Sequence, residues 1–361
     1  MEQQDRKPRI AITHGDTNGV GYELIFRIFE DPAMLELCTP IIYGSPKVAT
    51  YHRKAMNMET QFNVISHADE ARENKLNLLT TFDEDIKVEI GQSSEEATDA
   101  ARKALKRAMV DVQQGLADVL VMGPDNLPDF LSKEPEVLRV RMIDDLRMAL
   151  VTNLLAIKDV PESITKPIIV DKVKILHTCL CRDLRISNPR IAILALNPPT
   201  GDEENPWGEE EKEIIIPAIE ELEQAGIQAF GPYAADKIFG SSDYLQFDAV
   251  LAMYHDQGIA PLKSLSSDEG VSLLTGMPFV CTRPETGVEY GQAGKGTADE
   301  TALRHAIFLG IDVFRNRLNY DEPLANPLPK LYKEKRDDSE KVRFAIPKAR
   351  EPKKEEKENN Q

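Results

Sequence analysis

The segment Ala249-Val250-Leu251-Ala252-Met253-Tyr254-His255-Asp256-Gln257-Gly258, followed by Lys263, says most about how this chain is built. Its aliphatic first half predicts a buried strand, and its polar second half predicts a turn broken by glycine. The strand would deliver an imidazole, a carboxylate and an ammonium group to one place. An imidazole can bind a metal or transfer a proton, and a lysine can hold a phosphate or carboxylate. One histidine is too few for a catalytic divalent metal, which normally has about three protein ligands.

Strand and helix signals alternate around this segment. This β-then-α order predicts an α/β fold, a mostly parallel sheet with helices on both faces. Residues 124–145 carry prolines and many charges, and they predict loop and short helix. Ser93 is the predicted N-cap of a long helix, with Glu96 in capping-box spacing. Strands are predicted at 9–13, 40–43, 118–122, 147–152, 190–196, 249–253, 271–275 and 279–282, and helices at 22–30, 46–56, 93–115, 164–184, 207–224 and 297–316.

Composition narrows the class of protein. A chain of 361 residues with 41% hydrophobic residues suits two globular domains or one large α/β unit. The 61 acidic and 44 basic residues give a net charge of −17, which disfavours nucleic acid and anionic membranes as partners. A well-solvated surface is the better explanation of this charge. With no apolar leader or bilayer-length apolar run, and four cysteines without C-x-x-C spacing, a cytoplasmic protein with free thiols is expected.

Several glycine-rich segments could be binding loops or plain turns. His14–Gly21 lies between a strand and a helix, where glycines let a backbone approach an anion, but its spacing is not G-x-G-x-x-G. Asn197–Asp202 and Gly231–Asp236 follow strands, and prolines and glycines there need no functional reason. Gly291–Gly296 contains Lys295 and could cradle phosphate. The residues alone leave both readings open for each segment.

Taken together, these segments resemble the 4-hydroxythreonine-4-phosphate dehydrogenases of pyridoxal phosphate (vitamin B6, pyridoxine) biosynthesis. The resemblance runs in family order from near the start of the chain to about Arg317, and the Met-Tyr-His-Asp-Gln-Gly word is highly specific. The matching words are Ile12–Asp16 with Gly19–Gly21, Ala195–Pro198, Gly231–Asp236, Ala252–Gly258 and Ala293–Gly296.

The resemblance implies a homodimer of two-domain α/β/α subunits similar to the isopropylmalate dehydrogenases. The implied first domain is residues 1–125 with about 290–320, and the second, carrying the dimer interface, is 126–289. A polar, disordered tail is expected over 321–361. The implied reaction is oxidation of a phosphorylated hydroxy-amino acid, 4-phosphohydroxy-L-threonine, by NAD or NADP, followed by decarboxylation. A divalent metal (zinc, magnesium or cobalt) held by three histidines would stabilise the developing alkoxide and enolate.

Carried over residue by residue, the resemblance makes His255 the third metal histidine and Lys263 the substrate-phosphate lysine. If activity remains, Asp256 is expected to orient the His255 ring. At the first and second histidine positions this chain has Asn153 and Pro199. Proline has no side-chain donor atom. Because losing even one outer-shell partner typically costs a metal site 10- to 100-fold in affinity, these changes predict weak metal binding and weak or absent oxidation.

Other substrate positions differ as well. The family's Gly-His-Thr-Glu loop is missing, and a lysine of the family is replaced near Leu127. The family's substrate asparagine falls on Ser272 and its arginine on Cys281, with Arg283 two residues further on. Three hypotheses follow: a weakly active or inactive dehydrogenase, a non-catalytic binding or regulatory protein that pairs with an intact paralogue, and metal-free chemistry on another phosphorylated small molecule.

Overall fold

A computed structural model describes residues 6–82, 86–127, 134, 136–200, 207–265 and 270–325. Residues Met1–Asp321 form one compact unit and Glu322–Gln361 a second. The predicted division of the first unit into two domains stays a prediction. Gly201, Asp202 and the predicted tail from residue 326 onward lie outside the described residues.

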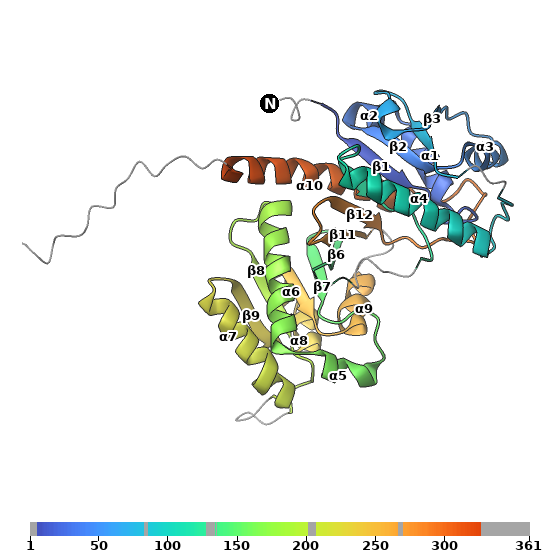
Figure 1. Ribbon diagram of the computed structural model, residues 1–361. Coiled ribbons are helices and arrows are strands. Elements are labelled where there is room, and N and C mark those ends of the chain that lie inside the picture. Colours follow the sequence, from blue (N-terminus) through green and yellow to red (C-terminus); the bar gives the residue numbers. More distant parts are fainter. Residues whose placement is uncertain are drawn as a thin grey trace, which may run out of the picture. The chain divides into compact units, whose positions relative to one another are not determined.

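The strands of the described residues form one twelve-stranded sheet in the order β3-β4-β2-β1-β5-β12-β11-β6-β7-β10-β8-β9 (Figure 1). Most neighbours are parallel, but β11 runs antiparallel to β12 and β6, and β6 runs antiparallel to β7. The strands are β1 (Arg9–Thr13), β2 (Thr39–Gly44), β3 (Asn63–Ile65), β4 (Asn77–Thr80), β5 (Val119–Val121), β6 (Leu138–Ile143), β7 (Leu146–Leu150), β8 (Arg190–Leu194), β9 (Gln228–Tyr233), β10 (Ala249–Ala252), β11 (Val271–Thr275) and β12 (Val280–Pro284).

Helices cover both faces of this sheet, because alternate residues of its buried strands are apolar on both sides. Along β1, Ile10 and Ile12 join one core cluster with α1 and α10, while Ala11 joins another with α4. The helices are α1 (Gly21–Phe29), α2 (Pro32–Leu37), α3 (Pro46–Ala55), α4 (Glu95–Gln113), α5 (Val160–Ser163), α6 (Lys166–Thr178), α7 (Ile216–Gln224), α8 (Ala235–Gly240), α9 (His255–Leu265) and α10 (Thr301–Ala325). The predicted mostly parallel α/β fold is confirmed.

Every strand predicted from the sequence occurs, with ends within two residues of the prediction. Four local predictions are wrong. Residues 138–143 form strand β6 rather than loop, and His255 begins helix α9 rather than a turn. Ser94, not Ser93, caps α4, accepting a hydrogen bond from the backbone N–H of Ala97. The last helix continues to Ala325, past its predicted end at residue 316.

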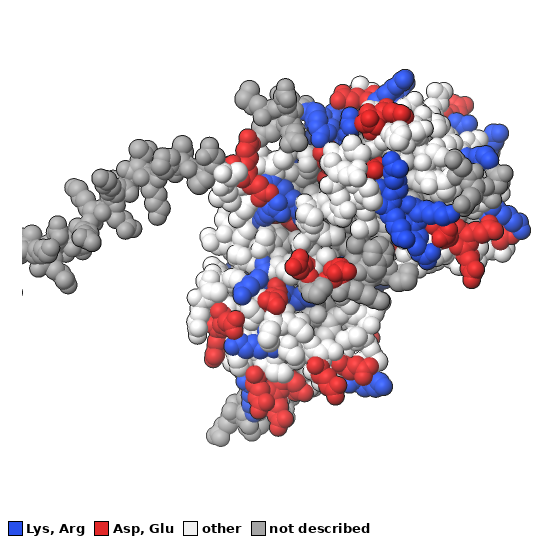
Figure 2. All heavy atoms as spheres, in the orientation of Figure 1, with Lys and Arg blue, Asp and Glu red and all other residues white. Residues whose placement is uncertain are grey.

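Charged side chains of both signs lie side by side over much of the face in Figure 2, which fits the well-solvated surface that the net charge allowed. No described helix is long and apolar enough to cross a membrane.

Gly258 lets α9 approach the sheet closely. A Cβ atom at this position would lie 2.9 Å from Leu150 Cδ2 and 3.0 Å from both Ala252 Cβ and Met148 Sδ. We expect Gly258→Ala to lower the free energy of unfolding by about 1–3 kcal/mol, because the added methyl group overpacks a close-packed contact. Gly240 ends α8, and a methyl group added there would meet nothing within 4 Å, so Gly240→Ala should be neutral or slightly stabilising. Equal losses in urea unfolding of the two variants would contradict this role of Gly258.

Candidate functional site

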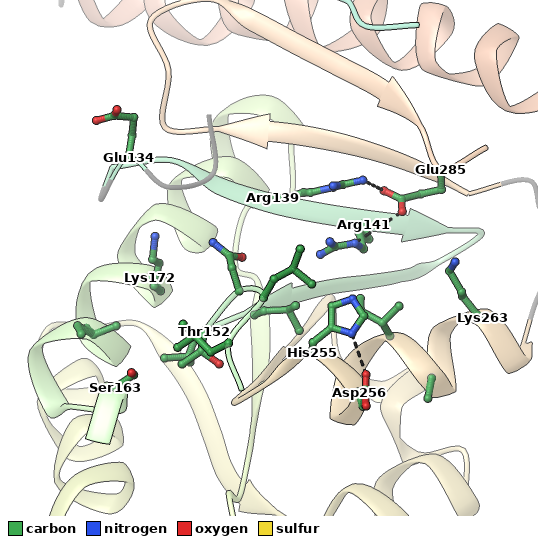
Figure 3. A pocket seen from close by; sticks show the side chains of 18 of the residues that line it. Glu134, Arg139, Arg141, Thr152, Ser163, Lys172, His255, Asp256, Lys263 and Glu285 are labelled. Atoms are coloured by element: carbon green, nitrogen blue, oxygen red, sulfur yellow. Dashed lines mark hydrogen bonds and ion pairs between the residues drawn. The ribbon is translucent and has the colours of Figure 1, made fainter. Parts of the chain in front are cut away.

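A cavity of about 1090 Å³ lies between α9, the end of β7, helix α6 and the wall formed by β6 and β12. Figure 3 shows His255 and Lys263 on α9 facing Arg139, Arg141 and Glu285 on that wall, with Asp256 on the other side of the His255 ring. The polar residues that line it include Glu134, Arg139, Arg141, Thr152, Asn153, Ser163, Asp171, Lys172, His255, Asp256, Lys263, Arg283 and Glu285.

Helix α9 presents its polar residues to this cavity at helical spacing. His255, Ile259 and Lys263 are four residues apart, so they lie along one face of the helix, and all three line the cavity. His255 Nδ1 lies 2.9 Å from Asp256 Oδ1. A carboxylate at Nδ1 favours the tautomer with a proton there, which leaves the Nε2 lone pair available to a ligand. The side chains of His255 and Asp256 are 36% and 77% exposed, so solvent and ligands reach both.

The ends of three neighbouring parallel strands are joined by hydrogen bonds beside His255. Thr152, after β7, donates from Oγ1 to the carbonyl of Met253, after β10, at 2.7 Å. Gln257 donates to the carbonyl of Ala195, after β8, at 2.6 Å. The carboxyl ends of parallel strands are where α/β proteins bind ligands. The chain therefore keeps the framework that would bring residues from these three strands together.

The residues at the family's metal positions do not fit a catalytic metal. Asn153 lines the cavity and offers an amide, but Pro199 has no donor atom and is not among the described residues that line the cavity. Within the described ranges no group of three or more His, Cys, Asp or Glu residues could hold a metal ion. Divalent transition metals in enzymes are normally held by about three strong side-chain donors. His255 alone supplies one of them.

The wall opposite α9 carries an ion-pair network that the sequence analysis missed. Arg139 Nη2 lies 2.5 Å from Glu285 Oε1, and Arg141 Nε lies 3.7 Å from Glu285 Oε2. Ser272 hydrogen-bonds Glu285 and accepts a bond of 2.9 Å from Arg139 Nε. Burial alone would raise the pKa of Glu285, but the two guanidinium groups and the Ser272 hydroxyl hold it below its usual value. Glu285 is therefore ionised.

Of the other residues at positions that the resemblance assigns to substrate binding, some line the cavity and others lie in the core. Arg283 and Leu127 line the cavity. Cys281 is fully buried in a core cluster, and Ser272 lies in the Arg139–Glu285 network. Cys281 and Arg283 are two residues apart on β12, so their side chains share one face of the sheet. Arg283 thus lies on the same face as the family's arginine position, which Cys281 occupies, and two residues further along the strand.

The space beside the glycines of the loop His14–Gly21 is occupied by other parts of the protein chain. A Cβ atom at Gly15 would lie 2.0 Å from the Pro124 carbonyl oxygen, and one at Gly19 would lie 2.4 Å from Val288. Asp16, in the same loop, accepts a hydrogen bond from Tyr290 at 2.8 Å. The glycines are needed for this packing, which supports the tight-turn reading of the loop.

His14 lies in the core among aromatic rings. It is fully buried, its ring stacks on Tyr22 with centroids 5.0 Å apart, and Tyr22 stacks in turn on His52. Burial, and to a smaller extent His52, lowers the pKa of His14 to about 3. In the unfolded chain a histidine titrates near 6.5. The folded protein therefore holds His14 neutral through the range in which the unfolded chain takes up its proton.

This burial predicts a pH dependence of stability. Between pH 6.5 and 3 the unfolded chain binds more protons at His14, so the stabilisation is complete above pH 6.5 and declines as the pH falls. His14 contributes up to about 1.4 kcal/mol per pH unit to this slope. We expect His14→Phe to flatten the decline in urea-unfolding free energy between pH 6.5 and 4.5, whereas His305→Phe, at an exposed position, should not. Identical slopes in both variants would refute the assignment.

A second cavity of about 350 Å³ shares Lys263 and Glu285 with the first. Besides Lys263, its charged lining residues are Glu285, Glu289 and Asp299. Hydrogen bonds from the Thr301 side chain and backbone keep the pKa of Asp299 low. Carboxylates accept hydrogen bonds from ribose hydroxyls and repel an added phosphate, as in the acidic residue that binds the NAD ribose in dinucleotide-binding folds. Glu289 and Asp299 therefore offer acceptors to the hydroxyl groups of a ligand.

Comparison with known proteins agrees with the resemblance in the sequence. The family described as pyridoxal phosphate biosynthetic protein PdxA matches residues 36–310. The 4-hydroxythreonine-4-phosphate dehydrogenase of Bacteroides thetaiotaomicron is 47% identical over 94% of this chain and 98% of its own length. The enzyme of that name from Sulfurihydrogenibium sp. is 34% identical over 86% and 99%.

The fold agrees too. A crystal structure of a 4-hydroxythreonine-4-phosphate dehydrogenase from Burkholderia phymatum superposes with a TM-score of 0.69, at 29% identity, over 86% of this chain and 99% of that one. These matches span almost the whole length of the relatives. The chain belongs to the PdxA family of pyridoxal phosphate biosynthetic proteins.

Proposed function

We propose that this chain binds a phosphorylated hydroxy acid of the 4-phosphohydroxy-L-threonine class in the main cavity, as a 4-hydroxythreonine-4-phosphate dehydrogenase homologue with much reduced or lost oxidation. The observation that carries this proposal is that the main cavity keeps residues for binding an anion but lacks two of the three metal histidines of the family. The cavity keeps His255, Lys263 and other basic side chains, while the family's other two metal positions hold Asn153 and Pro199. Binding of the anionic substrate needs the first set of residues, and metal-assisted oxidation needs the second.

The residues of this chain have separate roles in the proposal. Lys263 holds the substrate phosphate as a compact positive charge, and Asp256 orients the His255 ring, which can accept or donate a proton at Nε2. Glu289 and Asp299 accept hydrogen bonds from a ribose of NAD, which supplies the hydride acceptor when bound. The protein acts in the cytoplasm as a homodimer. Exposed apolar side chains support an interface near the cavity: Leu154, which lines it, is 78% exposed, and Ile157, three residues further along the chain, is 73% exposed.

The test combines binding and turnover. A ligand at 100 times its dissociation constant stabilises a protein by about 2.7 kcal/mol, so 4-phosphohydroxythreonine should raise the melting temperature measurably. Lys263→Met should abolish that shift, whereas Lys295→Met, at an exposed lysine outside both cavities, should retain it. NAD or NADP reduction with added zinc, magnesium or cobalt should be weak or undetectable. Robust turnover that disappears in His255→Ala would overturn the proposed loss of oxidation.

A second candidate function is favoured because the residues on α9 are kept while the other two metal positions are changed. Resemblance implies that His255 is donated to the neighbouring subunit's site, and the α9 residues His255 and Lys263 are intact while Asn153 and Pro199 are changed. A chain of this kind can complete the site of an intact paralogue. Co-purification from the native cell should then recover a mixed dimer, and recovery of homodimers alone would exclude this candidate.

A further inference from the structure

Three arginines stand in register on one wall of the main cavity. On the sheet, Arg141 of β6 lies opposite Ser272 of β11, and Ser272 lies opposite Arg283 of β12. Arg139 is two residues before Arg141, so its side chain is on the same face. All three arginines line the cavity. Strand pairing thus collects guanidinium groups from positions more than a hundred residues apart into one row.

The charges of the cavity are separated by depth. Arg139, Arg141, Arg283 and Lys172 are buried or half-buried, and Glu285 is the one acidic residue among the described lining residues that is not exposed. The other lining carboxylates, Glu134, Asp171 and Asp256, are exposed, where water and salt screen them. The protein carries a net charge of −17, yet basic side chains outnumber carboxylates among the described lining residues that are not exposed.

Arg139 and Arg141 of this row have polar partners, whereas one donor of Arg283 has none among the described residues. Taking a guanidinium group out of water costs free energy unless a partner compensates it, and Glu285 pairs with Arg139 and Arg141. The buried Nε of Arg283 has no hydrogen-bond partner among the described residues. Buried donors without a partner are rare in folded proteins, and they indicate a missing ligand or a strained site. The planar fork of arginine matches the two oxygens of a carboxylate.

We propose that Arg141, which pairs with Glu285, and Arg283 bind the carboxylate of a phosphorylated carboxylic acid whose phosphate lies at Lys263. The inference rests on the proposed function only in placing the ligand in the main cavity. It assigns binding roles to β6 and β12 residues that the resemblance leaves without one. It also explains why Cys281 can occupy the family's arginine position, since Arg283 supplies a guanidinium from the next position on the same face.

Two simple probes separate the carboxylate from the phosphate. 3-Phosphoglycerate carries both groups, and glycerol 3-phosphate carries only the phosphate. By isothermal titration of the full chain, we expect the unaltered protein to bind 3-phosphoglycerate at least tenfold more tightly. Arg283→Met should reduce this preference to about twofold or less with little change for glycerol 3-phosphate. Lys263→Met should weaken both probes at least tenfold. Arg147→Met, at a β7 arginine outside the cavity lining, should change neither.

A binding role differs from a structural role in its effect on the free protein. Without ligand, Arg283→Met should melt at the same temperature as the unaltered protein or higher, because it removes a buried charge. If that variant fails to fold, Arg283→Lys, which keeps the charge and loses the fork, should still bind glycerol 3-phosphate normally and lose most of the preference. An unchanged preference in both variants, or no preference in the unaltered protein, would overturn the inference. Arg283-dependent preference without any binding of 4-phosphohydroxythreonine would uphold it and refute the proposed function.

Discussion

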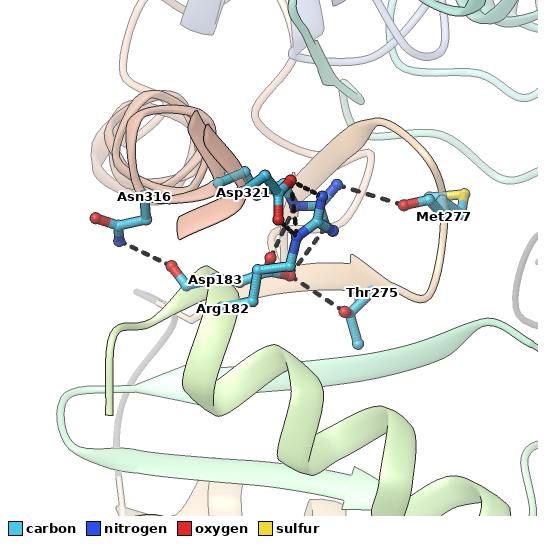
Figure 4. A network of polar contacts seen from close by, with 7 residues as sticks. Arg182, Asp183, Thr275, Met277, Asn316 and Asp321 are labelled. Atoms are coloured by element: carbon cyan, nitrogen blue, oxygen red, sulfur yellow. Dashed lines mark hydrogen bonds and ion pairs between the residues drawn. The ribbon is translucent and has the colours of Figure 1, made fainter. Parts of the chain in front are cut away.

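Replacing Arg317 with methionine is expected to lower the free energy of unfolding by about 3–5 kcal/mol, because it leaves a buried carboxylate without its counter-ion. Arg317 of α10 donates two hydrogen bonds to Asp183, from Nε at 2.7 Å and from Nη2 at 2.9 Å. The two residues are only 6% and 1% exposed. Thr275 on β11 donates to the same carboxylate, and Asn316 donates to the Asp183 carbonyl (Figure 4). The network ties α10 to β11 and to the turn after α6.

A neighbouring ion pair provides the control. Arg182 hydrogen-bonds Asp321, but that pair is much more exposed, so Arg182→Met should cost less than about 1 kcal/mol. Removing both buried charges in Asp183→Leu/Arg317→Met should recover much of the loss of Arg317→Met, since no charge is then left unpaired. Urea unfolding measures all three variants. A cost below about 1 kcal/mol for Arg317→Met would show that the pair does not hold this part of the fold together.

Introducing histidine at both changed metal positions, in Asn153→His/Pro199→His, is expected to raise the affinity for zinc or cobalt by at least about 100-fold. Each site would then hold three imidazoles, the two new ones and a His255, which the resemblance assigns to the neighbouring subunit. Loss of a single outer-shell partner already costs up to about 100-fold, so gaining two direct ligands should exceed that. Chelator competition measures the affinity, and cobalt absorption reports the geometry without any need for turnover.

The matched control is Asn153→Gln/Pro199→Ala, which alters both positions without adding an imidazole. It should bind metal as weakly as the unaltered protein. Adding His255→Ala to the double-histidine variant should remove most of the gain. Equal affinities in the histidine and control variants would mean that the substitutions at 153 and 199 are not what weakens metal binding.

The sequence predicted β1, β5, β8 and β10 well because their aliphatic runs leave few alternatives, but it did not predict the parallel strands β3, β4 and β9. It failed at β6, where Arg139 and Arg141 alternate with Leu138, Val140 and Met142. That alternation is a strand signal, but the charges in it suggested loop, and only the paired strands show that these arginines face a cavity. It failed at α9 for another reason. Gly258 and Pro261 are helix breakers, yet Gly258 is required where the helix touches the sheet.

The candidate site divides in the same way. Residues within one sequence word, such as His255, Asp256 and Lys263, could be located from the word itself and from resemblance. The arginine row could not, because its members become neighbours only through the pairing of β6, β11 and β12. The acidic second cavity likewise depends on the folding of 285–299 against α1. Long-range pairing, rather than local propensity, is what the sequence leaves undetermined.

The metal content of the purified, unaltered protein, measured together with ligand binding, tests most directly whether this cavity still binds an anion but no longer binds a divalent metal ion. After equilibration with zinc, magnesium or cobalt and removal of free metal, we expect far less than one bound ion per chain, together with a clear stabilisation by the phosphorylated ligand. About one tightly held ion per chain, lost in His255→Ala, would contradict the account.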